Sequence, residues 1–198
     1  SGFGYDQKLG FFAAGAPGRN TGVGQVAVYR FNGSIFSDQI LLPKSGSESL
    51  TSFGFGSSVS LFGPYLVVGA PNSDLLKGRA YVYKNVNQNE YWMNNNTNSW
   101  GQEVQLNPLG LSSAAKFGKS VNIFGNYIII GSPGNSSSFT GSAFVFERTL
   151  TESRTVNDLS SWVNSGQINS EYTDPVSGSN FINVGFGDAV SIFDNKIA

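Results

Sequence analysis

Cysteine and histidine are both absent from this sequence of 198 residues. Their absence excludes disulfides, thiolate nucleophiles, imidazole metal ligands and histidine-based catalytic triads within the chain. It leaves the redox compartment undetermined, because disulfides are what mark an oxidising environment.

Charged residues are also scarce, at 13% of the sequence, and the formal net charge is −1. The lysines and arginines are scattered singly, which argues against nucleic acid or an anionic membrane surface as a partner. No run of about 18 apolar residues occurs, so we expect no membrane insertion in this stretch.

Apolar, aromatic and glycine residues are plentiful: 39% of the residues are hydrophobic, 14% are aromatic and 25 are glycine. This composition favours short strands joined by many turns, because helices prefer alanine, leucine, glutamate and lysine. The length is sufficient to bury a sizeable core. The composition therefore predicts an all-β fold.

One motif recurs along the chain. The stretch Phe55–Pro71 returns as Phe117–Pro133, Phe12–Pro17 resembles its second half, and Phe186–Ala198 resembles its first half. A period of roughly 50 to 70 residues indicates a repeat architecture. We divide a single domain of residues 1–198 into approximate repeats at 3–52, 53–114 and 115–183, with the start of the next at 184–198.

Each repeat is predicted to form four strands, and the second repeat shows the pattern. Apolar runs predict strands at 59–62 and 65–68, separated by a Gly-Pro turn. A third strand is expected at 78–84, where small or branched side chains alternate with tyrosines. A weaker, outer strand starts at an aromatic residue and continues to a glutamine with apolar partners: Phe36 to Leu41, Trp100 to Leu106 and Trp162 to Ile168.

Four short strands per repeat, none able to bury its sheet alone, describe the blade of a β-propeller. The phenylalanine of each Phe-Gly pair is expected to wedge between neighbouring blades, where the glycine lets the sheets approach. We predict antiparallel four-stranded blades, about three of them, plus the first strand of another.

At these residues the chain resembles the FG-GAP repeat family, best known from the propeller head of integrin α subunits. The family pattern is met at Phe55-Gly56, Gly69-Ala70-Pro71 and Gly78–Tyr83, and the third repeat departs slightly with Gly131-Ser132-Pro133. The resemblance implies a propeller that usually has seven blades.

The chain stops at Ile197-Ala198, in the middle of an expected inner strand. Such an end would leave buried backbone groups unpaired, so we expect a fragment of a larger propeller. The alternative is a short chain that closes by pairing with other copies.

Calcium is the cofactor to consider, because many family members bind it in blade loops through Asp-x-Asp-x-Asp-Gly-like spacing. The corresponding loops here, 18–23, 72–77 and 134–140, contain a single carboxylate, Asp74. Asp74 is therefore only a weak candidate metal ligand. We expect these loops to be solvated turns that hold no cofactor.

Catalytic residues are not indicated. The acidic residues are dispersed over different repeats without a motif, and no Gly-x-Ser-x-Gly nucleophile elbow is present. We therefore predict no catalytic residues and no enzymatic activity in this stretch.

Three N-glycosylation sequons occur, at Asn32, Asn95 and Asn135. They favour an extracellular or cell-surface glycoprotein, although sequons also arise by chance in chains rich in asparagine and serine. We therefore predict a secreted location with these asparagines as acceptors.

Two aromatic residues are the best candidates for contact with a partner. Tyr91 and Trp92 have no counterpart in the first repeat, and aromatic side chains dominate many interfaces. Trp100 matches Phe36 and Trp162 in repeat position, so it is predicted to anchor an outer strand instead.

These features favour a non-enzymatic extracellular binding, adhesion or structural module that presents propeller loops to a protein or glycan. One alternative is an accessory propeller of an extracellular enzyme, such as a lyase or phospholipase, whose chemistry lies outside this stretch. Another is a self-assembling subunit of a filament or coat, with Tyr91, Trp92 and the 149–161 insertion buried between copies.

Overall fold

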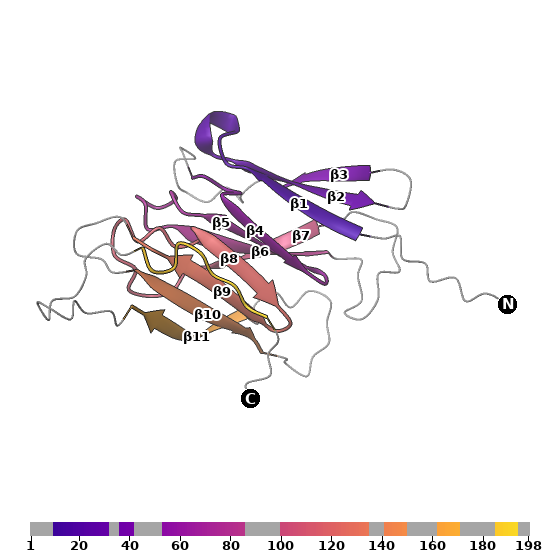
Figure 1. Cartoon of the computed structure of the whole chain (residues 1–198). Helices are drawn as coiled ribbons and strands as arrows, with labels where there is room; N and C mark the ends of the chain where they lie inside the picture. Colours follow the sequence, from indigo (N-terminus) through magenta and orange to yellow (C-terminus); the bar gives the residue numbers. More distant parts are fainter. Residues whose placement is uncertain are drawn as a thin grey trace, which may run out of the picture.

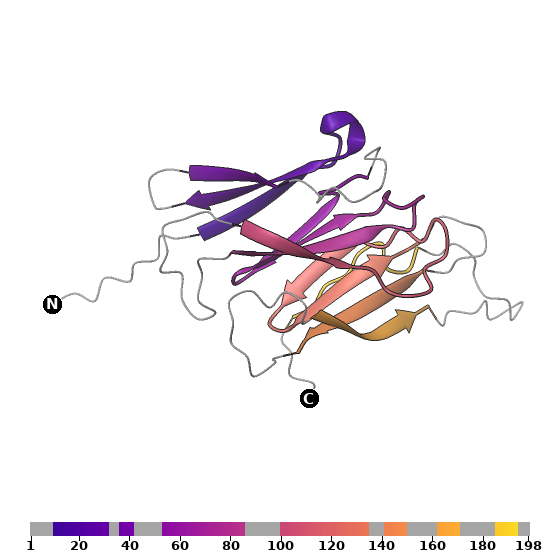
Figure 2. The same ribbon diagram turned by 180° about the vertical axis from the view of Figure 1, so that it is seen from behind.

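The computed structural model describes residues 10–31, 36–41, 53–85, 100–134, 141–149, 162–170 and 185–193. Within these ranges the fold is all-β, as predicted, and consists of three antiparallel sheets stacked in chain order (Figure 1). The view from behind shows the same order of sheets (Figure 2).

The first sheet has the strand order β1-β2-β3. Its strands are β1 (Gly10–Ala16), β2 (Gln25–Phe31) and β3 (Phe36–Leu41). β1 corresponds to the second strand of the other sheets, because it leads into Gly15-Ala16-Pro17, the counterpart of Gly69-Ala70-Pro71 and Gly131-Ser132-Pro133. β1, β2 and β3 are therefore the counterparts of the second, third and outer strands of the four-stranded sheets.

The second and third sheets each have the four strands that the sequence predicts. The second sheet contains β4 (Ser58–Phe62), β5 (Tyr65–Ala70), β6 (Arg79–Asn85) and β7 (Trp100–Leu106), in that order. The third contains β8 (Ser120–Phe124), β9 (Tyr127–Ser132), β10 (Ser142–Arg148) and β11 (Trp162–Asn169). The weak signal of an aromatic residue followed by a glutamine thus identified the outer strands correctly.

The predicted first strand of a further repeat is not present among residues 185–193, where only Phe186 forms a bridge. The physical reason is the lack of a partner. β4 and β8 pair with β5 and β9 of their own sheets, whereas this segment has no such neighbour within the described residues. It lies against the third sheet, where the Ile192 amide donates to Asn122 Oδ1 at 3.0 Å.

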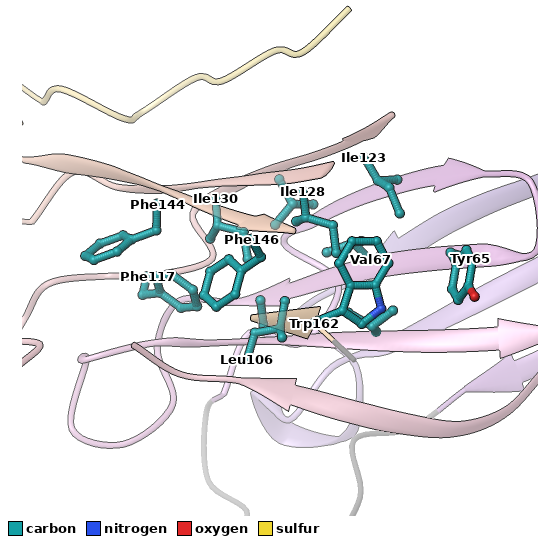
Figure 3. Close-up of a cluster of buried hydrophobic side chains, with 13 residues drawn as sticks. Tyr65, Val67, Leu106, Phe117, Ile123, Ile128, Ile130, Phe144, Phe146 and Trp162 are labelled. Carbon is teal, nitrogen blue, oxygen red and sulfur yellow. The ribbon is translucent and has the colours of Figure 1, made fainter. Parts of the chain in front are cut away.

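The core lies between the sheets, and β5 contributes to both of its halves. Leu66 and Val68 pack with residues of the first sheet, while Tyr65 and Val67 pack with residues of the third. All six β5 residues are buried, which explains why this strand is apolar without alternation. Figure 3 shows the half of the core between the second and third sheets.

Each Phe-Gly pair lies at a junction between two sheets. Phe55 bridges Gly24 of the first sheet, and Phe117 bridges Gly78 of the second, both in parallel orientation. Phe55 and Phe117 are fully buried, and Phe117 makes edge-to-face contacts with Phe144 (Figure 3). The predicted wedge between neighbouring sheets is confirmed at both junctions.

The glycine after the wedge allows main chain to touch main chain. Gly118 has a φ of 87°, and its carbonyl oxygen occupies the space that a β-carbon at Gly69 would need. The same oxygen accepts a hydrogen bond of 2.9 Å from Ser58 Oγ. This junction therefore requires glycine in both sheets.

Candidate functional site

The connection between β5 and β6, residues 71–78, forms an unusual left-handed turn. Asp74, Leu75 and Leu76 have φ values of 51°, 53° and 67°. Left-handed backbone is unfavourable for residues other than glycine because the β-carbon approaches the carbonyl oxygen. Three such residues in succession require a compensating interaction.

Part of that compensation is a pair of hydrogen bonds to the third sheet. The carbonyl oxygens of Leu76 and Lys77 accept hydrogen bonds from the amides of Lys116 and Phe117, each at 2.9 Å. The turn thus holds the segment that carries the next wedge. The side chains of Leu75 and Leu76 are exposed, while the main chain of the same turn is part of the junction.

The connection between β1 and β2, residues 17–24, makes the same turn with different side chains. Asn20, Thr21 and Gly22 have φ values of 50°, 56° and 91°. The carbonyl oxygens of Gly22 and Val23 accept hydrogen bonds from the amides of Gly54 and Phe55, at 2.9 and 3.0 Å respectively. We call this pair of main-chain hydrogen bonds between a turn and the next sheet the clamp. The clamp depends on backbone geometry and does not require leucine.

Asp74, the weak candidate metal ligand, lies beside a cation. Its Oδ2 atom is 3.8 Å from Arg79 Nη2, and its side chain is 40% exposed. Arg79 Nη1 also donates to Gln105 Oε1 at 3.5 Å. The described residues contain no group of three acidic side chains close enough to share a metal ion. In this arrangement the guanidinium competes with any cation for the Asp74 carboxylate.

A small pocket of about 160 Å³ lies between this turn and the segment that leads to the third sheet. We call it the junction pocket. Its polar wall includes Asp74, Lys77 and Arg79, and its apolar wall includes Leu109 and Leu111. Leu109 is 99% exposed, and Leu75 on the adjoining turn is 86% exposed.

Sequence reasoning missed this pocket. Leu109 and Lys77 are far apart in the sequence, and the pairing of β6 with β7, in which Ala80 lies opposite Leu106, brings their segments together. A signal was nevertheless present, because Leu75-Leu76 stands in a turn where the first repeat has Thr21-Gly22. Leu75 and Leu76 are both exposed in this turn.

The other predicted site residues fall partly outside the described ranges. The sequon asparagines Asn32, Asn95 and Asn135 lie outside them, as do the candidate contact residues Tyr91 and Trp92. The loop at 134–140 is described only at its first residue.

Trp100 is an outer-strand anchor, as predicted. It is buried and packs edge-to-face against Phe11 of the first sheet, with ring centroids 5.6 Å apart. Trp162 makes the same contact with Tyr65 at 5.6 Å (Figure 3). The outer tryptophans therefore join neighbouring sheets and are not a free platform for a ligand.

Antiparallel sheets that stack through repeated Phe-Gly wedges are compatible with the blades of a β-propeller. Residues 46–83 and 100–146 match the family model described as FG-GAP repeat. These two segments are thus FG-GAP repeats, as the sequence motifs predicted. No curated protein matches the chain in sequence.

Repeats of this family are typical of extracellular proteins. Across the described ranges, no helix has the length and apolar character needed to cross a membrane.

Proposed function

We propose that this chain is a non-enzymatic binding module of an extracellular protein, in which FG-GAP blades form a rigid scaffold for loops that contact a protein or glycan. One observation carries the proposal. The turns at 17–24 and 71–78 share their backbone and their hydrogen bonds to the next sheet, yet their exposed side chains differ. A rigid scaffold whose exposed loops carry different side chains is the usual arrangement of a recognition surface.

The first and last faces of the stack of sheets, which we call its end faces, are exposed, and this exposure supports the proposal of a larger propeller. Phe186 is 37% exposed, whereas its equivalents Phe55 and Phe117 are fully buried between sheets. At the other end, Phe12 is 54% exposed, whereas Leu66 at the same repeat position is buried. We propose that further FG-GAP blades cover both faces, because propellers generally close with about four to eight blades.

These end faces also favour a second candidate function, self-assembly into a filament or coat. The exposed surfaces at the two ends of the stack correspond to opposite sides of an internal junction. Such complementary surfaces allow copies to join head to tail. A native chain no larger than the 21.1 kDa of this sequence would favour this candidate over a larger propeller.

Mass spectrometry of the denatured native protein, before and after enzymatic removal of N-glycans, tests blade number and location together. We expect a chain much heavier than 21.1 kDa, with a loss of mass on deglycosylation at one or more of the three sequons. An unchanged mass would contradict the predicted use of the sequons and remove their support for a secreted location.

Binding itself is tested by probing arrays of cell-surface ectodomains and of glycans with the protein. We expect reversible, saturable binding to at least one member, with no chemical change in it. Turnover of a bound member would contradict the non-enzymatic assignment. The absence of any specific binder would contradict the proposed function.

A further inference from the structure

The side chain of Leu75 is not explained by the fold. The residue has a left-handed φ of 53°, which is unfavourable for leucine, and it is 86% exposed. The burial of apolar surface therefore does not offset this conformational strain. The equivalent Thr21 adopts the same backbone with φ 56°, and its turn makes the same hydrogen bonds to the next sheet. The clamp works without leucine, so Leu75 is available for another role.

Leu109 extends this apolar surface across the junction pocket. It is 99% exposed and lines the pocket together with Leu111, which packs partly against the core. Leu75 belongs to the turn on one side of the pocket, and Leu109 belongs to the segment on the other. Leu109 lines the pocket itself, and Leu75 stands in the turn between two lining residues, Asp74 and Lys77, so that both segments around the pocket carry an exposed apolar side chain.

The polar wall of the pocket carries a net positive charge at neutral pH. Lys77 and Arg79 provide two cations, and Asp74 is the carboxylate that lines the pocket with them. Arg79 is held in place by Asp74 at 3.8 Å and by Gln105 at 3.5 Å. A positioned guanidinium presents several parallel N–H donors, which suit a carboxylate better than a neutral group.

We propose that the junction pocket binds a segment of a protein partner in which an aspartate or glutamate adjoins large apolar side chains. The partner's carboxylate pairs with Lys77 and Arg79, and its apolar side chains cover Leu75 and Leu109. A volume of about 160 Å³ accommodates one such acidic side chain. This inference rests on the proposed binding function and assigns it a site and a chemical class of partner.

The chemistry of the walls favours a protein segment over a glycan. Sugar rings are commonly recognised by stacking on aromatic faces, and the residues that line the junction pocket include no aromatic ring. Exposed leucines offer nothing to a hydroxyl-rich ring but bury well against leucine or isoleucine. Binding of an anionic sugar is therefore an outcome that the test must distinguish.

Methyl and amide NMR spectra of the protein test the proposal directly. The probes are the peptide acetyl-Leu-Asp-Leu-amide, its matched control acetyl-Leu-Asn-Leu-amide, and sialyllactose. We expect the acidic peptide to shift the methyl signals of Leu75, Leu109 and Leu111, and to bind about tenfold more tightly than the control. No comparable shift is expected from sialyllactose.

The double variant Leu75→Thr with Leu76→Gly copies the turn of the first sheet and removes the apolar margin. We expect it to keep the wild-type fold, seen as unchanged signals from the second and third sheets, and to lose peptide binding about tenfold. The matched control Ile168→Thr removes an exposed apolar side chain on β11 and is expected to bind as the wild type does.

Several results would overturn the proposal. These are equal binding of the acidic and neutral peptides, stronger binding of sialyllactose at the pocket, or unchanged peptide binding by the folded double variant. An ectodomain that binds the double variant as tightly as the wild type would overturn this site while leaving the proposed binding function intact.

Discussion

The carbonyl oxygen of Gly118 lies where the β-carbon of any residue other than glycine at position 69 would have to stand. Gly69 belongs to the Gly-Ala-Pro motif of the second sheet, and Gly118 follows the wedge Phe117 of the third. The two halves of the FG-GAP pattern therefore meet across a junction and not within one repeat. The same relationship joins Gly15 to Gly56 and Gly131 to Gly187.

Gly69→Ala is expected to destabilise the protein because the obstructing atom is backbone and cannot rotate away. Overpacking of this kind costs about 1 to 3 kcal/mol in the free energy of unfolding. Urea denaturation measures the loss. Gly166→Ala on β11 is the matched control, since nothing lies within 4 Å of a β-carbon at that position. Equal midpoints for the two variants would contradict the packing at this junction.

Phe117→Ala is expected to cost much more stability than Phe186→Ala. Phe117 is fully buried between two sheets, whereas Phe186 is 37% exposed. Truncation of a buried phenylalanine typically costs about 3 to 5 kcal/mol, because burial is lost and a cavity remains. Thermal unfolding of the 198-residue chain compares the two. Similar losses of stability in the two variants would contradict the prediction that the buried phenylalanine stabilises the protein more than the partly exposed one.

Leu76→Gly is expected to raise stability, since glycine relieves the left-handed strain while the hydrogen bond from Lys116 to the carbonyl oxygen is retained. The gain is about 1 kcal/mol in the free energy of unfolding. The reciprocal change, Gly22→Leu, introduces the strain in the first sheet and is expected to cost a similar amount. Chemical denaturation of both variants checks the signs, and a loss in Leu76→Gly would show that its side chain packs favourably.

Tyr127 is expected to titrate above the usual range. Its hydroxyl donates to Glu147 Oε1 at 3.2 Å, and this hydrogen bond, together with the charge of the carboxylate, raises the pKa of Tyr127. The folded state therefore holds the proton more tightly than the unfolded state. The associated stability is present below the ordinary tyrosine pKa of 10.0 and is lost as pH rises through the raised value.

Ultraviolet titration of phenolate formation measures this shift. Glu147→Gln removes the negative charge and is expected to lower the pKa of Tyr127 towards its ordinary value, while Tyr127→Phe removes that component of the titration. An unchanged titration in Glu147→Gln would contradict the role of the carboxylate.

Much of the fold could be predicted because its signals are local. Alternation in Ala80–Tyr83, the unbroken apolar run of β5 and the Gly-Pro turn between β4 and β5 each predict a strand or a boundary by themselves. The position of Trp100 could be predicted by comparison with its equivalents in the other repeats. That comparison is possible because this one chain contains several copies of the repeat.

The rest required the arrangement in space. Asp74, Leu75 and Leu76 adopt a backbone that opposes their own preferences, so no propensity rule points to it. The junction pocket joins the segment before β6 to the segment after β7, and it depends on the pairing of these two strands, which are distant in the sequence. The missing strand at 189–193 likewise depends on a neighbouring strand and not on the apolar residues of that segment.

The clamp between the 71–78 turn and the third sheet has a mechanical consequence. A partner that pulls on Leu75 would pull on a turn whose next two carbonyl groups, at Leu76 and Lys77, are bonded to the amides of Lys116 and Phe117. Tension would thus pass directly to the wedge that both sheets enclose. Two sheets would resist the force together, where an unattached hairpin would peel away strand by strand.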